Sequence, residues 1–389
     1  MLTESRTSLA PLKTFLFSFH ATNTIILSYL PLYLRYKDFT ETEIGWVLAI
    51  GPFASLFSQP LWGYLSDKYN TVKTMILICV ISFLITGVVF FQLNTIVPIL
   101  LVGAIFFFFT FPVGALADSL GQRRAMELKI SFGTIRMWGS IGFAISSLLI
   151  GEVLNQVGIQ FIMWPFLVFG ILALLVGFKL QDVEATNSPI NLKDVKKLFQ
   201  SKAFIFFLIL VFFVALGHRA NDSFIGLYIT ELGGSERLVG IAWFIGVISE
   251  AAVFALAAFW FRKYPSLIFI IIAGIFYCLR WFIYAGIDQP IFVLVFQVLH
   301  GITFAVFYLA AFNYVSRIIP KNLQSTGHLL FYSVMFGLAG IIGSLVGGRL
   351  LDLFDGTVMY NVMGISAVIG TVGFIIFYYV TRNKSVEIS

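Results

Sequence analysis

Six ionisable side chains lie inside long apolar stretches of this sequence. They are three arginines and three acids: Arg136, Arg219, Arg280, Asp118, Asp222 and Glu250. A charge held in an apolar span is rare, and it marks a solute pathway, a proton relay or a pair with another charge. Guanidinium groups hydrogen-bond ligand oxygens in a bidentate manner. A carboxylate that alternates between apolar and cationic surroundings binds and releases a proton. The six residues therefore favour solute binding and proton coupling.

Spacing places several polar groups on one helix face. His218 and Asp222 are four residues apart, and Arg219 and Asp222 are three apart, so the three side chains can meet. An intrahelical salt bridge that only allows the helix to insert remains an alternative to a proton-carrying role for Asp222. Glu250 is the first candidate proton carrier. Its alternative explanation is neutralisation by Arg280 or by simple protonation.

Asp118 and Arg136 form the candidate ligand clamp, and a purely structural pair between two helices is the alternative. Trp138 and Phe143 follow on the same predicted helix and would stack a flat ligand, unless they only fill space towards lipid. His300 would contact the solute or tune a neighbouring acid. Its alternative role is a hydrogen bond between helices.

The elements that must hold these residues are membrane-spanning helices. The chain has 389 residues, of which 59% are hydrophobic and only 11% are charged, which excludes a soluble globular protein. A bilayer-spanning helix needs roughly 20 mostly apolar residues. Twelve such windows occur: 12–34, 43–65, 74–93, 97–119, 132–151, 160–180, 203–229, 239–260, 266–286, 290–314, 326–347 and 358–380. We therefore expect an all-α integral membrane protein.

Basic residues between the spans predict the orientation. With both termini in the cytoplasm, 18 lysines and arginines fall inside and four fall outside, as cytoplasmic loops require. The formal net charge of +6 is therefore a topology signal and predicts no nucleic-acid partner. The polar residues 1–11 and the long first span argue against a cleavable signal peptide. Short loops favour a bacterial inner membrane.

An internal repeat predicts two halves. Residues 32–69 align without gaps with residues 227–264, so the second span corresponds to the eighth. We therefore expect a six-helix half over 1–180, a charged cytoplasmic linker over 181–202 and a second six-helix half over 203–389. Each half would be one pseudo-repeat.

Two six-helix halves joined by a cytoplasmic linker resemble the major facilitator superfamily. A motif supports this, because Gly63-Tyr-Leu-Ser-Asp67-Lys68 resembles the start of the superfamily's G-x-x-x-D-[RK] loop, although residues 70–72 lack its later glycine and basic pair. The resemblance implies alternating access around a solute site at the half interface. It also implies a cytoplasmic gate of Gly63, Asp67 and Lys68, where Gly63 allows close helix approach and Asp67 meets a helix N-terminus or a basic residue.

Within the superfamily, the chain resembles the group of lactose permease, nucleoside–proton symporters and phenylpropionate permeases. The segment of Arg136 resembles permease helix 5, whose arginine pairs with a helix-4 carboxylate, and Asp118 precedes Arg136 by the same 18 residues. Glu250, Arg280 and His300 stand in segments similar to permease helices 8, 9 and 10. The resemblance implies that the first pair binds solute and that the second half couples transport to protons.

The chain departs from lactose permease at several positions. Thr303 stands where the permease has its proton-releasing glutamate, Gln297 where it has a lysine, and Phe143 where it has a sugar-stacking tryptophan. We therefore carry over the scaffold and the charge pair but not the sugar. A coupled proton must be held elsewhere, first at Glu250 and second at Asp222.

The sequence predicts a secondary active transporter that moves a small polar or aromatic solute by proton symport. A sugar, a nucleoside or an aromatic carboxylate would suit it. A proton-antiport exporter of drugs or metabolites is the alternative, and a non-transporting receptor is a further one. No P-loop or nucleophile–base set is present, so we expect no enzyme, no cofactor and no metal site. The expected partners are the solute, protons and the lipid bilayer, and the protein is expected to be a monomer.

Overall fold

The fold is an all-helical membrane architecture, seen in a computed structural model that describes residues 8–182, 198, 200–260, 264–319 and 323–381. Within these residues, 12 helices are long and apolar enough to cross a membrane, which confirms the predicted count. Most of the predicted linker, residues 183–197 and 199, lies outside the described part. The described residues fall into two compact units, and the first of them includes Ser235–Phe244.

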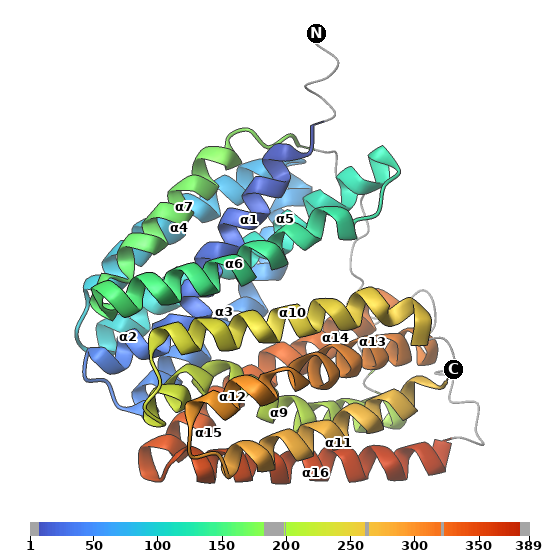
Figure 1. The fold of residues 1–389 in the computed structure, drawn as a ribbon. Coiled ribbons are helices and arrows are strands. Elements are labelled where there is room, and N and C mark those ends of the chain that lie inside the picture. The colour runs from blue at the N-terminus through green and yellow to red at the C-terminus, as the bar shows by residue number, and fades with distance from the viewer. Residues whose placement is uncertain (1–7, 183–197, 199, 261–263, 320–322, 382–389) are drawn as a thin grey trace. The chain divides into compact units, whose positions relative to one another are not determined.

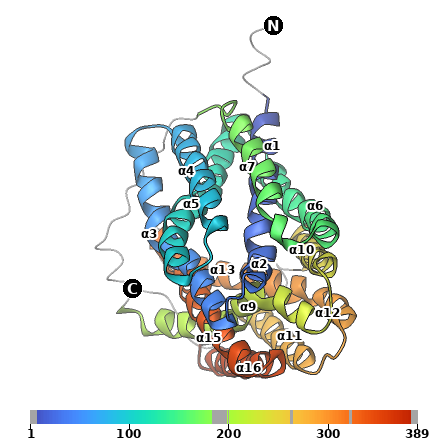
Figure 2. The same cartoon turned by 90° about the vertical axis from the view of Figure 1, so that its left-hand side faces the viewer.

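Unit 1 contains the first six spans. Its elements are α1 (Ala10–Thr24), the π-helical segment η2 (Ile25–Tyr29), α2 (Leu30–Tyr36), α3 (Glu41–Lys68), α4 (Val72–Gln92), α5 (Ile96–Leu128), α6 (Gly133–Val157), the 3₁₀ turn η3 (Ile159–Phe161) and α7 (Met163–Gly177). Helix α5 packs against both α3 and α4 (Figure 2). It also continues past the predicted end at residue 119, and an Arg124–Glu127 ion pair of 2.7 Å lies in its last turns.

Unit 2 contains the last six spans, apart from the first turns of α10. Its elements are α9 (Lys202–Glu231), α10 (Glu236–Trp260), α11 (Ser266–Ala285), α12 (Pro290–Gln297), the π-helical segment η4 (Gly301–Val306), α13 (Phe307–Ile318), α14 (Gln324–Tyr332), the π-helical segment η6 (Ser333–Leu338), α15 (Ala339–Leu353) and α16 (Gly356–Thr381) (Figure 1). Segments η4 and η6 interrupt the tenth and eleventh spans. Single π-helical turns of this kind are frequent at functional sites.

Polar side chains define where helices begin in unit 1. Thr40 and Glu43 form a capping box at the start of α3, in which each side chain accepts a backbone N–H of the other residue. Asp182 caps α4 from beyond α7, since its Oδ1 accepts the N–H groups of Val72 and Lys73 at 2.8 and 3.0 Å. This contact joins the chain after the sixth span to the start of the third.

Lys37, just after α2, connects this part of the chain to the end of α4. Its Nζ donates to the carbonyl oxygens of Phe91 and Leu93, at 2.6 Å each, and lies 4.9 Å from the ring centroid of Tyr33. Burial lowers the pKa of Lys37. The two carbonyl contacts satisfy the ammonium group at the end of α4.

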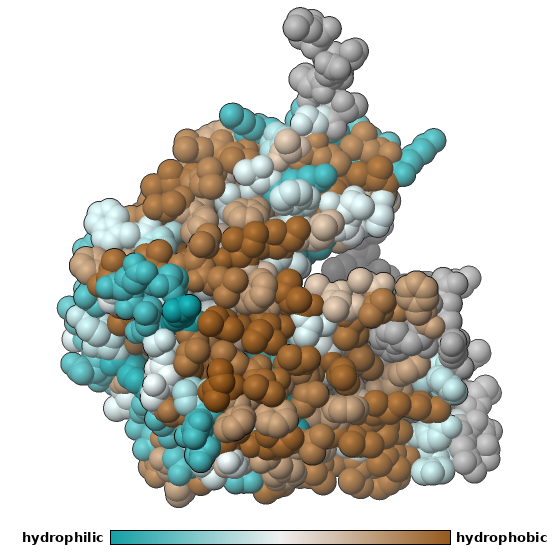
Figure 3. All heavy atoms as spheres, in the orientation of Figure 1, coloured by the Kyte–Doolittle hydropathy of each residue, from teal (hydrophilic) through white to brown (hydrophobic). Residues whose placement is uncertain are grey.

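Helix α11 shows why a charge can lie inside a span. Its exposed apolar side chains, Ile272, Ile275, Leu279 and Phe282, are spaced by three and four residues and form one stripe. Arg280 and Tyr284 lie on the buried side of the same helix. The face of unit 2 seen in Figure 3 is covered largely by apolar side chains, as a lipid-facing surface requires. Arg280 therefore lies on a different side of α11 from the apolar stripe.

Close packing between α1 and α6 gives a testable prediction. A Cβ added at Gly142 would lie 2.7 Å from the Cα of Phe17, so the backbone of α1 would have to move. We expect Gly142→Ala to destabilise the protein by about 1–3 kcal/mol and to lower its melting temperature in detergent. Gly63→Ala is the matched control, since a Cβ there meets nothing within 4 Å and alanine favours a helix. Equal melting temperatures for the two variants would contradict the packing assigned to Gly142.

Candidate functional site

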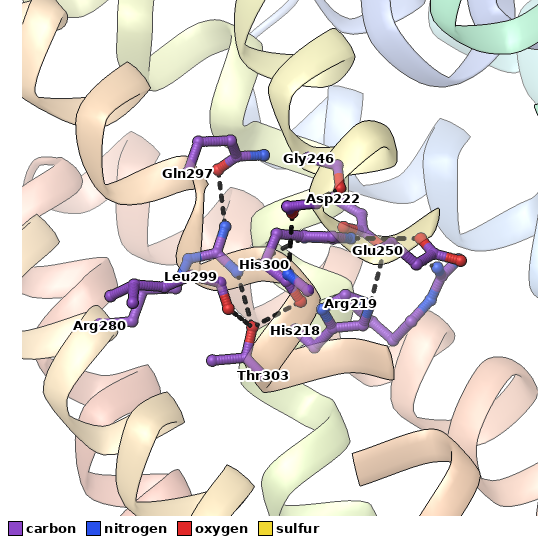
Figure 4. Close-up of polar contacts among 12 residues, drawn as sticks. His218, Arg219, Asp222, Gly246, Glu250, Arg280, Gln297, Leu299, His300 and Thr303 are labelled. Carbon is purple, nitrogen blue, oxygen red and sulfur yellow. Dashed lines mark hydrogen bonds and ion pairs between the residues drawn. The ribbon is translucent and has the colours of Figure 1, made fainter. Parts of the chain in front are cut away.

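Polar side chains from four elements of unit 2 converge on one cluster. Helix α9 contributes His218, Arg219 and Asp222, helix α10 contributes Glu250, helix α11 contributes Arg280, and the span from α12 to η4 contributes Gln297, His300 and Thr303 (Figure 4). The five residues predicted for proton coupling therefore lie near His300, which was predicted as a solute contact. Two groups of contacts make up the cluster.

Arg280 occupies a fully buried cage of neutral groups. Its Nη2 donates to Gln297 Oε1 at 2.7 Å, and its Nη1 donates to Thr303 Oγ1 at 3.0 Å (Figure 4). Tyr284 completes the cage, because its hydroxyl accepts from Nη2 at 3.4 Å and donates to Gln297 Oε1 at 2.8 Å. Gln297, Thr303 and Tyr284 carry no formal charge, so none of these three partners offsets the positive charge of Arg280. Such a buried cation provides a fixed positive potential for its neighbours.

His300 connects this cation to Glu250. Its Nδ1 lies 3.5 Å from Arg280 Nη1, and its Nε2 lies 3.7 Å from Glu250 Oε2. Because arginine only donates, we assign Nδ1 as the acceptor, which leaves the hydrogen on Nε2 facing the carboxylate. The structure thus shows no direct Glu250–Arg280 pair within the described residues, in contrast to one alternative raised from the sequence. A direct pair is absent because His300 lies between the two groups.

Asp222 anchors the second group of contacts on α9. Its Oδ2 accepts from Arg219 Nη1 at 2.8 Å and lies 3.4 Å from His218 Nε2. His218 and Asp222 are buried, whereas the side chain of Arg219 is 18% exposed. The i,i+3 and i,i+4 contacts match the predicted spacing. His218 also lies beside His300, with ring centroids 5.4 Å apart, so the two groups adjoin.

Asp118 and Arg136 form an ion pair in unit 1. Arg136 Nε lies 3.1 Å from each carboxylate oxygen of Asp118, and the two side chains are 37% and 35% exposed, respectively. The pair is therefore only partly buried. Gly139 lies beside it, since a Cβ there would come 2.7 Å from Arg136 Nη1 and 2.9 Å from His20 Nε2. A larger residue at position 139 would displace the guanidinium.

The two aromatic residues predicted beside this pair have different surroundings. Trp138 is exposed, and Lys13 Nζ lies 6.0 Å from its ring centroid. Phe143 is buried and contacts Trp243 with ring centroids 5.6 Å apart. Of the two, Trp138 presents more ring surface for stacking.

The Gly63–Lys68 motif takes part in a second ion pair of unit 1. Arg123 Nη2 donates to Asp67 Oδ1 at 3.0 Å, so Asp67 meets a basic residue of α5. Lys68 Nζ lies over the rings of Tyr64 and Tyr69. A Cβ added at Gly63 would meet nothing within 4 Å, and close helix approach at this glycine stays a prediction.

Comparison with known proteins decides the family. The family model of the MFS_1 like family matches residues 9–362. The chain belongs to this family. It is therefore a transporter of the major facilitator superfamily and a multi-pass membrane protein. Its all-helical fold agrees with that assignment.

Relatives in the family are transporters of several solutes. The chain is 27% identical to the uncharacterized transporter YwbF of Bacillus subtilis (strain 168) over 364 residues, 93% of this chain and 91% of YwbF. It is 27% identical to a maltose permease of Geobacillus stearothermophilus, covering 94% and 93% of the two chains. It is also 26% identical to a probable 3-phenylpropionic acid transporter of Escherichia coli (strain K12), covering 77% and 80%.

A solved structure confirms the fold. The crystal structure of the nucleoside transporter NupG superposes with a TM-score of 0.83 at 20% sequence identity, covering 96% of this chain and 99% of NupG. The likeness covers nearly the whole chain, which confirms the major facilitator fold predicted from the sequence.

Three site residues of this MFS_1 like protein were not predicted from the sequence. Gln297 and Thr303 were seen as losses relative to lactose permease, and Tyr284 was not singled out. All three bind Arg280. A signal was present, because Gln297 and Thr303 stand three residues before and after His300 and share its face. Once a buried cation is known, spacing in the sequence therefore helps to identify its uncharged partners.

Proposed function

We propose that the chain is a proton symporter that moves a small polar or aromatic solute across a bacterial inner membrane by alternating access. The observation that carries this proposal is the series Arg280, His300 and Glu250, which runs from a fully buried cation to a partly exposed acid. An acid 27% exposed can exchange protons with water, while its histidine neighbour, 6% exposed, connects it to a fixed cation. The proton gradient would be the driving force, and no cofactor is required.

Glu250 is the proposed proton carrier. Its Oε2 lies 3.7 Å from His300 Nε2, and helix movement during alternating access would change this separation. Asp222 is the second candidate, held by Arg219 and His218. When helix movements change either contact, the carboxyl group concerned would bind a proton in one conformation and release it in the other. Coupling then follows if solute binding favours one of these states.

The Asp118–Arg136 pair is proposed to bind the solute. A guanidinium has five N–H donors, so Arg136 keeps donors for ligand oxygens while it holds Asp118. Trp138 is the proposed stacking partner, with Phe143 and His300 as further predicted contacts. Two relatives, a maltose permease and a probable 3-phenylpropionic acid transporter, support a solute of the sugar or aromatic carboxylate class. Nucleosides are the third class.

The topology is also part of this proposal. We place both termini and the 181–202 linker in the cytoplasm, between six-helix halves at 1–180 and 203–389. Asp67, with Arg123 and Lys68, would then act at a cytoplasmic gate that forms and breaks its ion pair during the cycle. We propose a monomer as the transporting unit.

Uptake by proteoliposomes tests this function. With purified protein and an acid-outside pH gradient, we expect accumulation of at least one of maltose, uridine and 3-phenylpropionate. A protonophore should abolish that accumulation. Uptake that ignores both the gradient and the protonophore, or no uptake of any of the three, would contradict proton symport. Gradient-driven expulsion of preloaded solute would instead support the antiport alternative.

A further inference from the structure

Two rows of aromatic side chains run along neighbouring spans of unit 2. Each row has a spacing of four residues, which keeps its rings on one helix face. One row is Phe304, Tyr308 and Phe312, and the other is His328, Tyr332 and Phe336. The rows meet in antiparallel order, as Phe304 with Phe336, Tyr308 with Tyr332, and Phe312 with His328. We call these six rings the aromatic ladder.

Four rings of the ladder form a closed group. Phe304 stacks on Tyr308 and Tyr332 stacks on Phe336, with centroids 5.7 Å apart in both pairs. Phe304 meets Phe336 edge to face at 6.4 Å, and the hydroxyl groups of Tyr308 and Tyr332 hydrogen-bond each other. All four side chains are only half-buried, so ring surface stays accessible. We call Phe304, Tyr308, Tyr332 and Phe336 the aromatic quartet.

The quartet adjoins the charged cluster of unit 2. The His218 ring lies nearly parallel to Phe304, with centroids 4.7 Å apart and an interplanar angle of 11°. Arg219 Cζ lies 5.7 Å from the ring centroid of Phe336. Both phenylalanines belong to the π-helical segments η4 and η6. The π-helical segments η4 and η6 therefore hold two rings of the quartet, and one of these, Phe336, contacts the partly exposed Arg219.

Arg219 retains hydrogen-bonding capacity beside the quartet. Its Nη1 binds Asp222, whereas its Nε is buried and has no hydrogen-bond partner among the described residues. A carboxylate that approached the Nε edge of the guanidinium would satisfy this donor. The accessible rings next to it offer π surface but little hydrogen-bonding capacity, because the two tyrosine hydroxyls already bond each other. Such a surface suits an aryl group better than a sugar with many hydroxyls.

We propose that the aromatic quartet and Arg219 form a subsite for an aromatic carboxylate, with the aryl ring on the quartet and the carboxylate on the Nε edge of Arg219. This inference rests on the proposed function, since it names the solute class. Among the three solute classes considered from the sequence, it selects the aromatic carboxylates.

Matched ligands test the two halves of this recognition. We expect 3-phenylpropionate to bind purified full-length protein in isothermal titration calorimetry. Its saturated analogue, 3-cyclohexylpropionate, keeps the charge but lacks the π system, and should bind about three- to tenfold more weakly. Its uncharged analogue, 3-phenylpropan-1-ol, should bind at least about tenfold more weakly. No binding of 3-phenylpropionate, or equal binding of the three compounds, would overturn the proposal.

Substitutions in the chain test whether 3-phenylpropionate binds at the aromatic quartet and Arg219. Phe336→Leu should weaken 3-phenylpropionate binding about three- to tenfold, because it removes the ring but keeps an apolar side chain. Phe312→Leu is the matched control, since Phe312 belongs to the ladder but lies outside the quartet, and it should leave binding unchanged. Arg219→Lys keeps a cation for Asp222 but loses the fork, and should remove the preference for 3-phenylpropionate over 3-phenylpropan-1-ol. Equal affinities for Phe336→Leu and Phe312→Leu would contradict the subsite.

Failure of this inference is distinguishable from failure of the proposed function. If maltose or uridine accumulates with the pH gradient while 3-phenylpropionate does not bind, symport stands and the subsite is wrong. If 3-phenylpropionate binds as described but no solute flux responds to the gradient, the subsite stands and proton symport is wrong.

Discussion

Glu250→Gln is expected to abolish concentrative uptake while solute exchange continues. Glutamine keeps the shape and a hydrogen-bond acceptor beside His300 but cannot carry a proton. Solute inside proteoliposomes should therefore rise only to the external concentration, with or without a pH gradient. Counterflow, in which internal unlabelled solute exchanges for labelled solute, needs no net proton movement and should persist. Uptake and counterflow measured on the same vesicles check both expectations.

The matched control for this experiment is Glu152→Gln in unit 1. Glu152 is an acid 42% exposed, 3.3 Å from Arg237, and an exposed pair of this kind contributes little to stability. We expect it to accumulate solute normally. If Glu250→Gln retains accumulation, Glu250 is not the proton carrier, and the same experiment on Asp222→Asn decides the second candidate.

The second large effect concerns the Asp118–Arg136 pair. Removal of either partner leaves an unpaired charge inside a span, which costs about 3–5 kcal/mol for a fully buried pair and less for this partly exposed one. We expect Asp118→Ala and Arg136→Ala each to lower the melting temperature and to stop uptake. The double variant has no unpaired charge, so its melting temperature should recover towards the wild-type value. Its uptake should remain absent because the ligand clamp is missing.

This double variant separates the two explanations of the pair. A purely structural pair predicts that stability and uptake recover together in the double variant. A ligand clamp predicts recovery of stability alone. Arg136→Lys adds a finer comparison, because it preserves the charge but loses the planar fork that binds oxygens.

The fold could be predicted almost completely from the sequence because span length and apolarity are imposed by the bilayer. Twelve windows predicted the twelve candidate spans found among the described residues, and the 32–69 and 227–264 repeat predicted two halves. Helix ends were harder to place. Helix α5 runs to Leu128 because polar residues continue a helix outside the apolar window. The π-helical segments were not predicted, since no local pattern in the sequence marks them.

The charged members of the site could be identified, but their partners could not. Apolar surroundings single out Arg280 in the sequence, whereas Gln297 and Thr303 are polar residues that occur often in helices. The contact between His300 and Glu250 depends on how η4 and α10 pack, which sequence spacing does not define. The aromatic quartet was missed because 44 phenylalanines conceal a four-residue spacing. Its pairing depends on two helices that meet in antiparallel order.

The most direct test of proton symport is to measure whether solute entry moves protons into the vesicle. Proteoliposomes with a pH-sensitive dye inside receive a transported solute outside, with no imposed pH gradient. The account predicts that solute entry acidifies the interior of wild-type vesicles, and that Glu250→Gln vesicles show no pH change while counterflow continues. Solute entry without any pH change in wild-type vesicles would contradict proton symport.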